Sequence, residues 1–198
     1  MRLAISLALV FAPAVALAQV QPQSASAPLT TEQQIASAVL PIPAEFRASA
    51  TVLGYAADRR LVTLRQGTGA FVCLASDPAQ ERFHVACYHR ALEPFMARGR
   101  ELRARGITQL EKVDSARFAD VKAGRLRMPE QPAALYSLTG GRFDPATGVA
   151  EGARPLFVIY VPNATAESTG LSATPSASAP WLMFPGTPKA HIMFTPRM

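Results

Sequence analysis

Two histidines and a cysteine lie within one short segment of the sequence, at His84, Cys87 and His89. Imidazole and thiolate groups at such spacing are ligands that zinc and copper accept in proteins. In a strand, however, side chains alternate between the two faces, so that His84 and Cys87 would point in opposite directions. A metal site would need a bend at this place or help from a distant residue. One alternative is therefore a metal-binding protein that uses His84, His89 and His191, with or without Cys87.

The chain contains two cysteines, Cys73 and Cys87. Disulfide bonds form in oxidising compartments, and two cysteines this close in sequence are well placed to pair there. A loop of this length predicts a stabilisation of about 3 kcal/mol in the chain-entropy model. We expect a Cys73–Cys87 disulfide, with free thiols or metal ligation as the alternatives.

The positive charge of the chain is concentrated in residues 82–127, where nine arginines and two lysines face five acidic residues. An apolar stripe at helical spacing predicts a helix from Ala91 to a glycine stop at Gly106. The basic face of this helix is expected to contain four arginines: Arg98, Arg100, Arg103 and Arg105. Such a face attracts an anionic partner, and we expect an anionic lipid, a polyanion or another exported protein. The alternative is a solvated helix face without a partner.

Signatures of catalysis and of nucleic-acid binding are not found in the sequence. No Gly-x-Ser-x-Gly elbow occurs, and the segment Gly67-Thr68-Gly69 lacks the lysine of a phosphate-binding loop. No nucleic-acid motif accompanies the basic segment, so nucleic acid is not an expected partner. We therefore expect a binding or interaction module without a cofactor. A hydrolase with a site built from dispersed residues is a further alternative, and the question of enzymatic activity stays open.

The first residues of the chain predict export. Arg2 precedes an apolar run, and Ala16-Leu17-Ala18 is the small-x-small pattern of a signal peptidase site. We therefore assign residues 1–18 to a signal peptide, 19–31 to a disordered Pro/Ser/Ala tether and 32–198 to a single domain. No later run is long enough to span a membrane. The mature protein is expected in the periplasm or the medium, and its oligomeric state is left open.

The pattern of strands and helices predicts an α+β fold with a mostly antiparallel sheet and two or three short helices. Four short β-rich segments between residues 51 and 88 indicate a meander. A capping box at Thr30 begins a first helix, and Ser115 is a candidate N-cap for a helix over 116–123. Strands return after Pro132, and the apolar run 156–161 indicates a strand inside the sheet.

Several of these segments resemble an uncharacterised family of exported bacterial proteins that have a Cys pair. The resemblance covers roughly residues 45–195 and rests on four runs: Ala50-Thr51-Val52-Leu53-Gly54-Tyr55, Phe71-Val72-Cys73-Leu74, Phe83-His84-Val85-Ala86-Cys87-Tyr88-His89 and Leu92-Glu93-Pro94-Phe95-Met96. It implies an exported single domain with a Cys pair. It implies no activity, ligand or cofactor.

Overall fold

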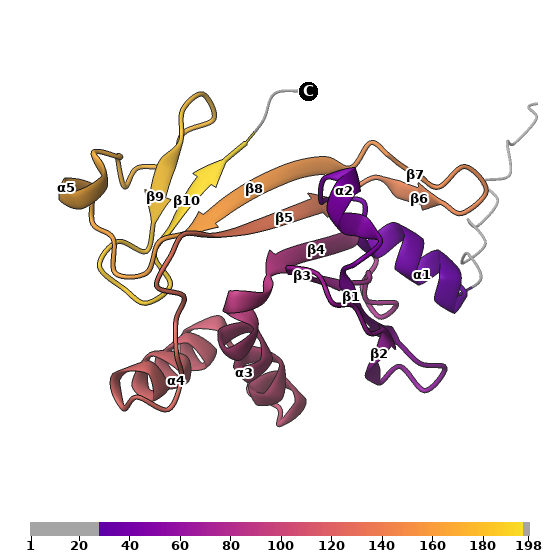
Figure 1. Ribbon diagram of the computed structural model, residues 1–198, viewed down its shortest axis with the longest axis horizontal. Coiled ribbons are helices and arrows are strands. Elements are labelled where there is room, and N and C mark those ends of the chain that lie inside the picture. The colour runs from indigo at the N-terminus through magenta and orange to yellow at the C-terminus, as the bar shows by residue number, and fades with distance from the viewer. Residues whose placement is uncertain (1–27, 196–198) are drawn as a thin grey trace, which may run out of the picture.

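The computed structural model describes residues 28–195 and has the α+β architecture expected from the sequence (Figure 1). Its strands are β1 (Thr51–Tyr55), β2 (Leu61–Arg65), β3 (Phe71–Leu74), β4 (His84–His89), β5 (Ala133–Thr139), β6 (Arg142–Asp144), β7 (Val149–Glu151), β8 (Arg154–Tyr160), β9 (Trp181–Met183) and β10 (His191–Phe194). Its helices are α1 (Thr31–Ala38), α2 (Ala44–Arg47), the short 3₁₀ helix η1 (Arg90–Leu92), α3 (Glu93–Ala104), α4 (Leu110–Lys122) and α5 (Ala166–Thr169).

Eight strands form one sheet in the order β2-β1-β3-β4-β5-β8-β10-β9, and β6 and β7 form a separate hairpin. Among the pairings of the described residues, β1 with β3 is parallel and the others are antiparallel. The hairpin extends from the ends of the long strands β5 and β8, as Figure 1 shows. The predicted mostly antiparallel sheet is confirmed.

The predicted meander of the first four strands is wrong in its order, because β2 lies at the edge and β1 pairs directly with β3. The chain leaves β2 and crosses the start of β1 before it enters β3. Gly69 N–H donates to Ser49 O at 2.8 Å in this crossing. A Cβ atom on Gly67 would lie 2.2 Å from the same Ser49 oxygen. Gly67 and Gly69 therefore allow one backbone to pass close to another.

One face of the sheet packs against α1 and the segment that follows it. The buried residues of this core include Ala38, Ile42, Val52 and both cysteines. Helix α1 begins with the predicted capping box, in which Thr30 Oγ1 accepts from Gln33 N–H. The sequence prediction of this helix is therefore confirmed at its first turn.

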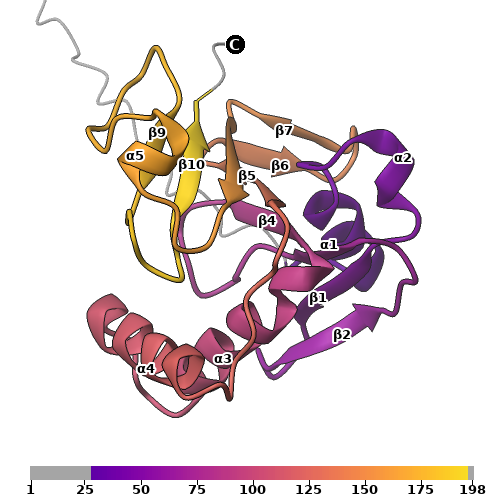
Figure 2. The same cartoon turned by 60° about the vertical axis from the view of Figure 1, so that its left-hand side comes forward.

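The opposite face is covered by η1 and α3 over only part of its area. Leu92 and Met96 belong to a core with Val72, Tyr88 and Val158 of the sheet. Figure 2 shows α3 and α4 side by side as a helical hairpin that projects beyond the strands. The other end of this face has no helix over it among residues 28–195, and the candidate site lies there.

Helix α4 starts six residues earlier than the sequence suggested. Ser115 is not an N-cap; it is exposed in the middle of the helix, and Gln109 occupies the N-cap position without a side-chain capping bond. Val113, Asp114 and Arg117 form the buried face of α4. Burial of this face, which capping rules do not detect, extends the helix to Leu110.

The predicted signal peptide, residues 1–18, and most of the predicted tether lie outside the described residues, and α1 already begins at Thr31. Among the helices of residues 28–195, none has both the length and the apolar character needed to cross a bilayer.

Candidate functional site

Strand register places three rows of side chains across the face of the sheet that η1 and α3 partly cover. The row under η1 and α3 contains Val72, Tyr88, Leu135 and Val158. The next row contains Leu53, Leu74, Ala86, Ser137 and Leu156. The last row, at the strand ends, contains His84, Thr139 and Arg154. Because side chains alternate along each strand, all three rows point to the same side.

The second and third rows line a partly enclosed hollow of about 360 Å³, which we call the apolar hollow. Its walls are Tyr55, Leu74, Ala75, Asp77, Gln80, Arg82, His84, Ala86 and Thr139. Ala86 is a small residue next to Leu74 in the second row, and its methyl group leaves space for the hollow above the sheet. The loop from β3 to β4 supplies the outer, polar wall.

The polar groups of the apolar hollow interact with one another. His84 Nδ1 lies 2.7 Å from Thr139 Oγ1. Desolvation lowers the pKa of His84, which favours a neutral imidazole at pH 7. Burial, with a smaller contribution from Asp77, raises the pKa of Tyr55 and keeps its hydroxyl protonated.

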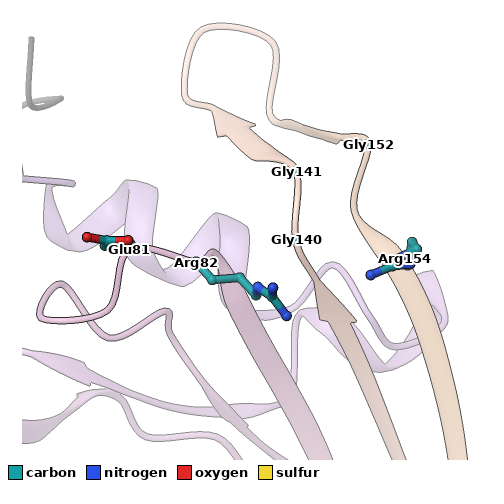
Figure 3. Close-up of a pocket in the computed structure, with 6 residues that line it drawn as sticks. All are labelled: Glu81, Arg82, Gly140, Gly141, Gly152 and Arg154. Atoms are coloured by element: carbon teal, nitrogen blue, oxygen red, sulfur yellow. The ribbon is translucent and has the colours of Figure 1, made fainter. Parts of the chain in front are cut away.

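A second, more open hollow of about 520 Å³ adjoins the first, and we call it the arginine hollow. Its lining is Glu81, Arg82, Gly140, Gly141, Gly152 and Arg154. Figure 3 shows Arg82 and Arg154 on opposite sides of Gly140, with both side chains extended toward the space between them, while Glu81 points away. Arg82 lines both hollows, so the two adjoin at its side chain.

Backbone geometry at the glycines creates the floor of the arginine hollow. Gly141 has a φ of +63°, and a Cβ atom there would lie 2.1 Å from Glu151 O. Only glycine fits this position, because the link from β5 to β6 passes directly against the link from β7 to β8. Phe83 and Phe143 stack with their ring centroids 6.2 Å apart, and this contact holds the start of β4 beside β6.

The four arginines predicted to form a basic face on α3 differ from this pair, because three of them form ion pairs within the chain. Arg98 contacts Asp120 and Glu101, both at 2.8 Å. Arg100 contacts Glu93 at 2.6 Å, and Arg105 also pairs with Glu101. Arg103 is exposed and forms no ion pair with residues 28–195. Most of the positive charge that the sequence places on α3 is therefore neutralised locally.

Arg82 and Arg154, in contrast, have neither an ion-pair nor a side-chain hydrogen-bond partner in the described part of the chain. Other arginines without a carboxylate, such as Arg47 and Arg65, donate to backbone carbonyl groups instead. Two guanidinium groups that line one hollow without a carboxylate partner among residues 28–195 have donors free for one oxyanion.

The three histidines considered as metal ligands do not come together. His84 and His89 begin and end β4, which separates them by about 16 Å at the rise of an extended strand. His89 Nδ1 accepts from Ala91 N–H, whereas His191 is buried on β10, with Nδ1 2.7 Å from Lys189 O. Residues 28–195 contain no group of three or more His, Cys, Asp or Glu side chains arranged to hold a metal ion. The three-histidine hypothesis therefore has no shared site in this structure.

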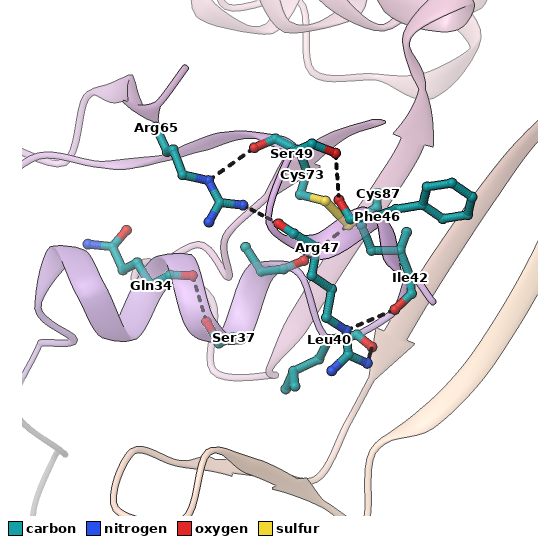
Figure 4. The surroundings of a disulfide bond; sticks show 12 residues. Gln34, Ser37, Leu40, Ile42, Phe46, Arg47, Ser49, Arg65, Cys73 and Cys87 are labelled. Carbon is teal, nitrogen blue, oxygen red and sulfur yellow. Dashed lines mark hydrogen bonds between the residues drawn. A yellow bond between two sulfur atoms is a disulfide. The ribbon is translucent and has the colours of Figure 1, made fainter. Parts of the chain in front are cut away.

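Cys73 and Cys87 form the expected disulfide between directly opposite positions of β3 and β4. Both cysteines are fully buried beneath the segment that joins α1 to β1. Figure 4 shows Arg47 and Arg65 around it, where they donate to the carbonyl groups of Leu40, Ile42 and Ala50 and so fasten this covering segment. The disulfide is a buried structural link on the face opposite the hollows, and Cys87 is not available as a metal ligand.

A buried group of charges links α4 to the loop before β10. Lys189 Nζ lies 2.7 Å from Asp114 Oδ2, and Arg117 Nη1 lies 3.5 Å from Asp114 Oδ1. Arg117 also stacks over Phe95, with Cζ 4.2 Å from the ring centroid. These side chains fit a structural role, because their contacts attach the helical hairpin to the last strands of the sheet.

Sequence reasoning missed Arg154 and treated Arg82 only as part of a basic segment. The two residues are 72 positions apart and come together only through the register His84–Thr139–Arg154 across three strands. A usable signal exists in the glycines at 140, 141 and 152, which flank β6 and β7 and mark a close backbone crossing.

Comparisons with known proteins found no family model, no curated protein and no solved structure that matches the chain. The resemblance to a family of exported proteins therefore stays a prediction from the sequence runs alone. The Cys pair of the resemblance forms a disulfide in the structure.

Proposed function

We propose that this protein is an exported binding module whose ligand carries an oxyanion group, held between Arg82 and Arg154. One observation carries the proposal: these two arginines line one hollow with no carboxylate partner among residues 28–195, whereas Arg98, Arg100 and Arg105 each have one. The anionic partner expected from the sequence is retained, and its binding site moves from α3 to the strand ends.

The chemistry of the arginine hollow suits recognition of an oxyanion. A guanidinium group presents a rigid planar fork of N–H donors that matches a phosphate, sulfate or carboxylate group. The glycines at 140, 141 and 152 place no side chain between the two forks, so an anion has access to both. Both arginines are exposed, which predicts a weak affinity that decreases as salt is added.

Hydrolysis is less well supported by the same residues. The His84–Thr139 contact resembles a base beside a hydroxyl group, but a triad needs a third group that orients the base. No carboxylate within residues 28–195 bonds to His84, and Asp77 Oδ1 accepts from Ala79 N–H instead. Binding is therefore the function we propose.

Export is the second part of the proposal. A buried disulfide forms in an oxidising compartment, and the N-terminal pattern of the sequence is that of a cleaved signal peptide. The test is expression of the full chain in a bacterium, followed by fractionation and mass spectrometry. We expect a mature chain that begins at Gln19 outside the cytoplasm. An uncleaved chain confined to the cytoplasm would contradict export.

The binding proposal is tested by titrating the purified protein with inorganic phosphate in an isothermal calorimeter at low ionic strength. Because a hydrogen bond to a charged group contributes about 1.5 kcal/mol or more, R82Q/R154Q is expected to bind at least tenfold more weakly than the wild type. The matched control is R103Q/R127Q, which removes two exposed arginines that line neither hollow. Equal weakening in both double variants, or no binding by the wild type, would contradict the proposal.

A further inference from the structure

The apolar hollow adjoins the proposed oxyanion site, and Arg82 belongs to the walls of both. We propose that the ligand is a small amphiphilic anion, whose charged group lies between Arg82 and Arg154 and whose apolar part enters the apolar hollow. This inference rests on the proposed oxyanion site and adds the chemical class of the rest of the ligand.

The apolar hollow has the composition that an apolar group requires. Its floor is the second row of the sheet face, where Leu74 and Ala86 lie side by side in register. The Tyr55 ring forms part of one wall, and its neutral hydroxyl group places no charge in the hollow. Most of the lining is carbon, in contrast with the arginine hollow. An anion alone leaves this surface in contact with water, whereas an attached hydrocarbon removes it from water.

Two polar residues of the apolar hollow, His84 and Thr139, lie on the side where the charged group of the ligand would be. His84, Thr139 and Arg154 occupy neighbouring positions in the last row across β4, β5 and β8. Ala86 is one pleat further inside, two residues along β4 from His84. A ligand that extends from Arg154 toward Ala86 therefore passes from the arginine hollow into the apolar hollow.

The size of the apolar hollow limits the apolar part of the ligand. Its volume of about 360 Å³ lies near the lower end of the range for small-molecule sites. A single ring or a short alkyl chain fits this class of site, and a long acyl chain would extend into solvent.

The inference is tested with a homologous series of methyl, propyl and pentyl phosphate, titrated under the same conditions as inorganic phosphate. Full burial of one methylene group improves affinity about fourfold. We expect affinity to increase by a factor of about two to four for each added methylene. Pentanol, which has the chain and lacks the charge, is expected to bind far more weakly than pentyl phosphate.

Two variants test where the alkyl chain of the ligand binds. A86L fills the floor of the apolar hollow and is expected to remove the dependence on chain length while leaving the affinity for inorganic phosphate within twofold of the wild type. The matched control is A134L, which adds the same side chain to β5 on the opposite face of the sheet. Thermal unfolding of both variants establishes that each is folded at the temperature of the titration.

The outcomes separate this inference from the proposed function. Equal affinity for methyl and pentyl phosphate, with both lost in R82Q/R154Q, would overturn the amphiphilic ligand and leave the oxyanion site intact. A chain-length dependence that persists in A86L but disappears in A134L would place the apolar part elsewhere and also overturn the inference. No binding of any phosphate, inorganic phosphate included, would overturn the proposed function itself.

Discussion

Asp114→Asn is expected to destabilise the fold by about 3 kcal/mol, because Asp114 is the one carboxylate between two buried cations. Its side chain is 12% exposed and contacts Lys189 at 2.7 Å and Arg117 at 3.5 Å. The isosteric amide keeps the packing and removes the negative charge. Lys189 and Arg117, whose side chains are 11% and 6% exposed, would then remain buried without a carboxylate partner among residues 28–195. Removal of one partner from a buried pair costs about 3–5 kcal/mol, and the residual exposure places this case at the lower end.

The relative losses of stability in two related variants test the same reasoning. Lys189→Met leaves Asp114 paired with Arg117, and it is therefore expected to cost less than Asp114→Asn. Asp58→Asn, in the exposed pair with Arg60, is the control and is expected to cost much less than Asp114→Asn, because water screens an exposed ion pair.

The assay is urea unfolding at pH 7, with thermal unfolding as a second measure. A loss of about 3 kcal/mol corresponds to a decrease in Tm of about 6–12 °C for a domain of this size. The reasoning is refuted if the stability of Asp114→Asn lies within about 0.5 kcal/mol of the wild type, the range that is usual for surface substitutions, or if Lys189→Met costs more than Asp114→Asn.

Three further predictions concern the disulfide, the helical hairpin and pH. Replacing Cys73 and Cys87 together by alanine is expected to reduce the free energy of unfolding by about 3 kcal/mol, measured by urea denaturation, and an unchanged midpoint would contradict it. Gly99→Ala would place a Cβ atom 1.6 Å from Arg117 Nη2, so we expect a cost of at least about 2 kcal/mol and disruption of the α3–α4 contact, whereas a neutral substitution would show that Arg117 relocates freely. Burial lowers the pKa of His191 below its ordinary value of 6.5, so the unfolded chain binds a proton more readily than the folded one. Stability should therefore decrease as the pH is lowered through 6.5, and His191→Gln should flatten this slope between pH 7.5 and 5; an unchanged slope would contradict the assignment.

Short sequence patterns predicted the parts of the fold that depend on interactions between residues near one another in the sequence. The Thr30 capping box and the glycine at the end of α3 mark helix termini where the structure has them. The proximity of Cys73 and Cys87 in sequence predicted a disulfide that directly opposite strand positions allow.

Interactions between distant segments account for the parts that the sequence did not predict. The pairing of β1 with β3 depends on the crossing at Gly67, and the early start of α4 depends on burial of Asp114 against Lys189. The local pairing of the arginines in the basic segment was not predicted for a related reason. Its arginines are numerous, but Glu93, Glu101 and Asp120 reach them in space. The candidate site instead uses two arginines that only strand register brings together.

Side-chain ¹H–¹⁵N NMR of the arginine Nε–H groups, recorded during a titration with phosphate, tests the central claim most directly. Phosphate between Arg82 and Arg154 should shift both of their signals with a common dissociation constant. The signals of Arg98 and Arg103 should stay in place. Shifts confined to the arginines of α3, or no saturable shift at all, would contradict an oxyanion site at the strand ends.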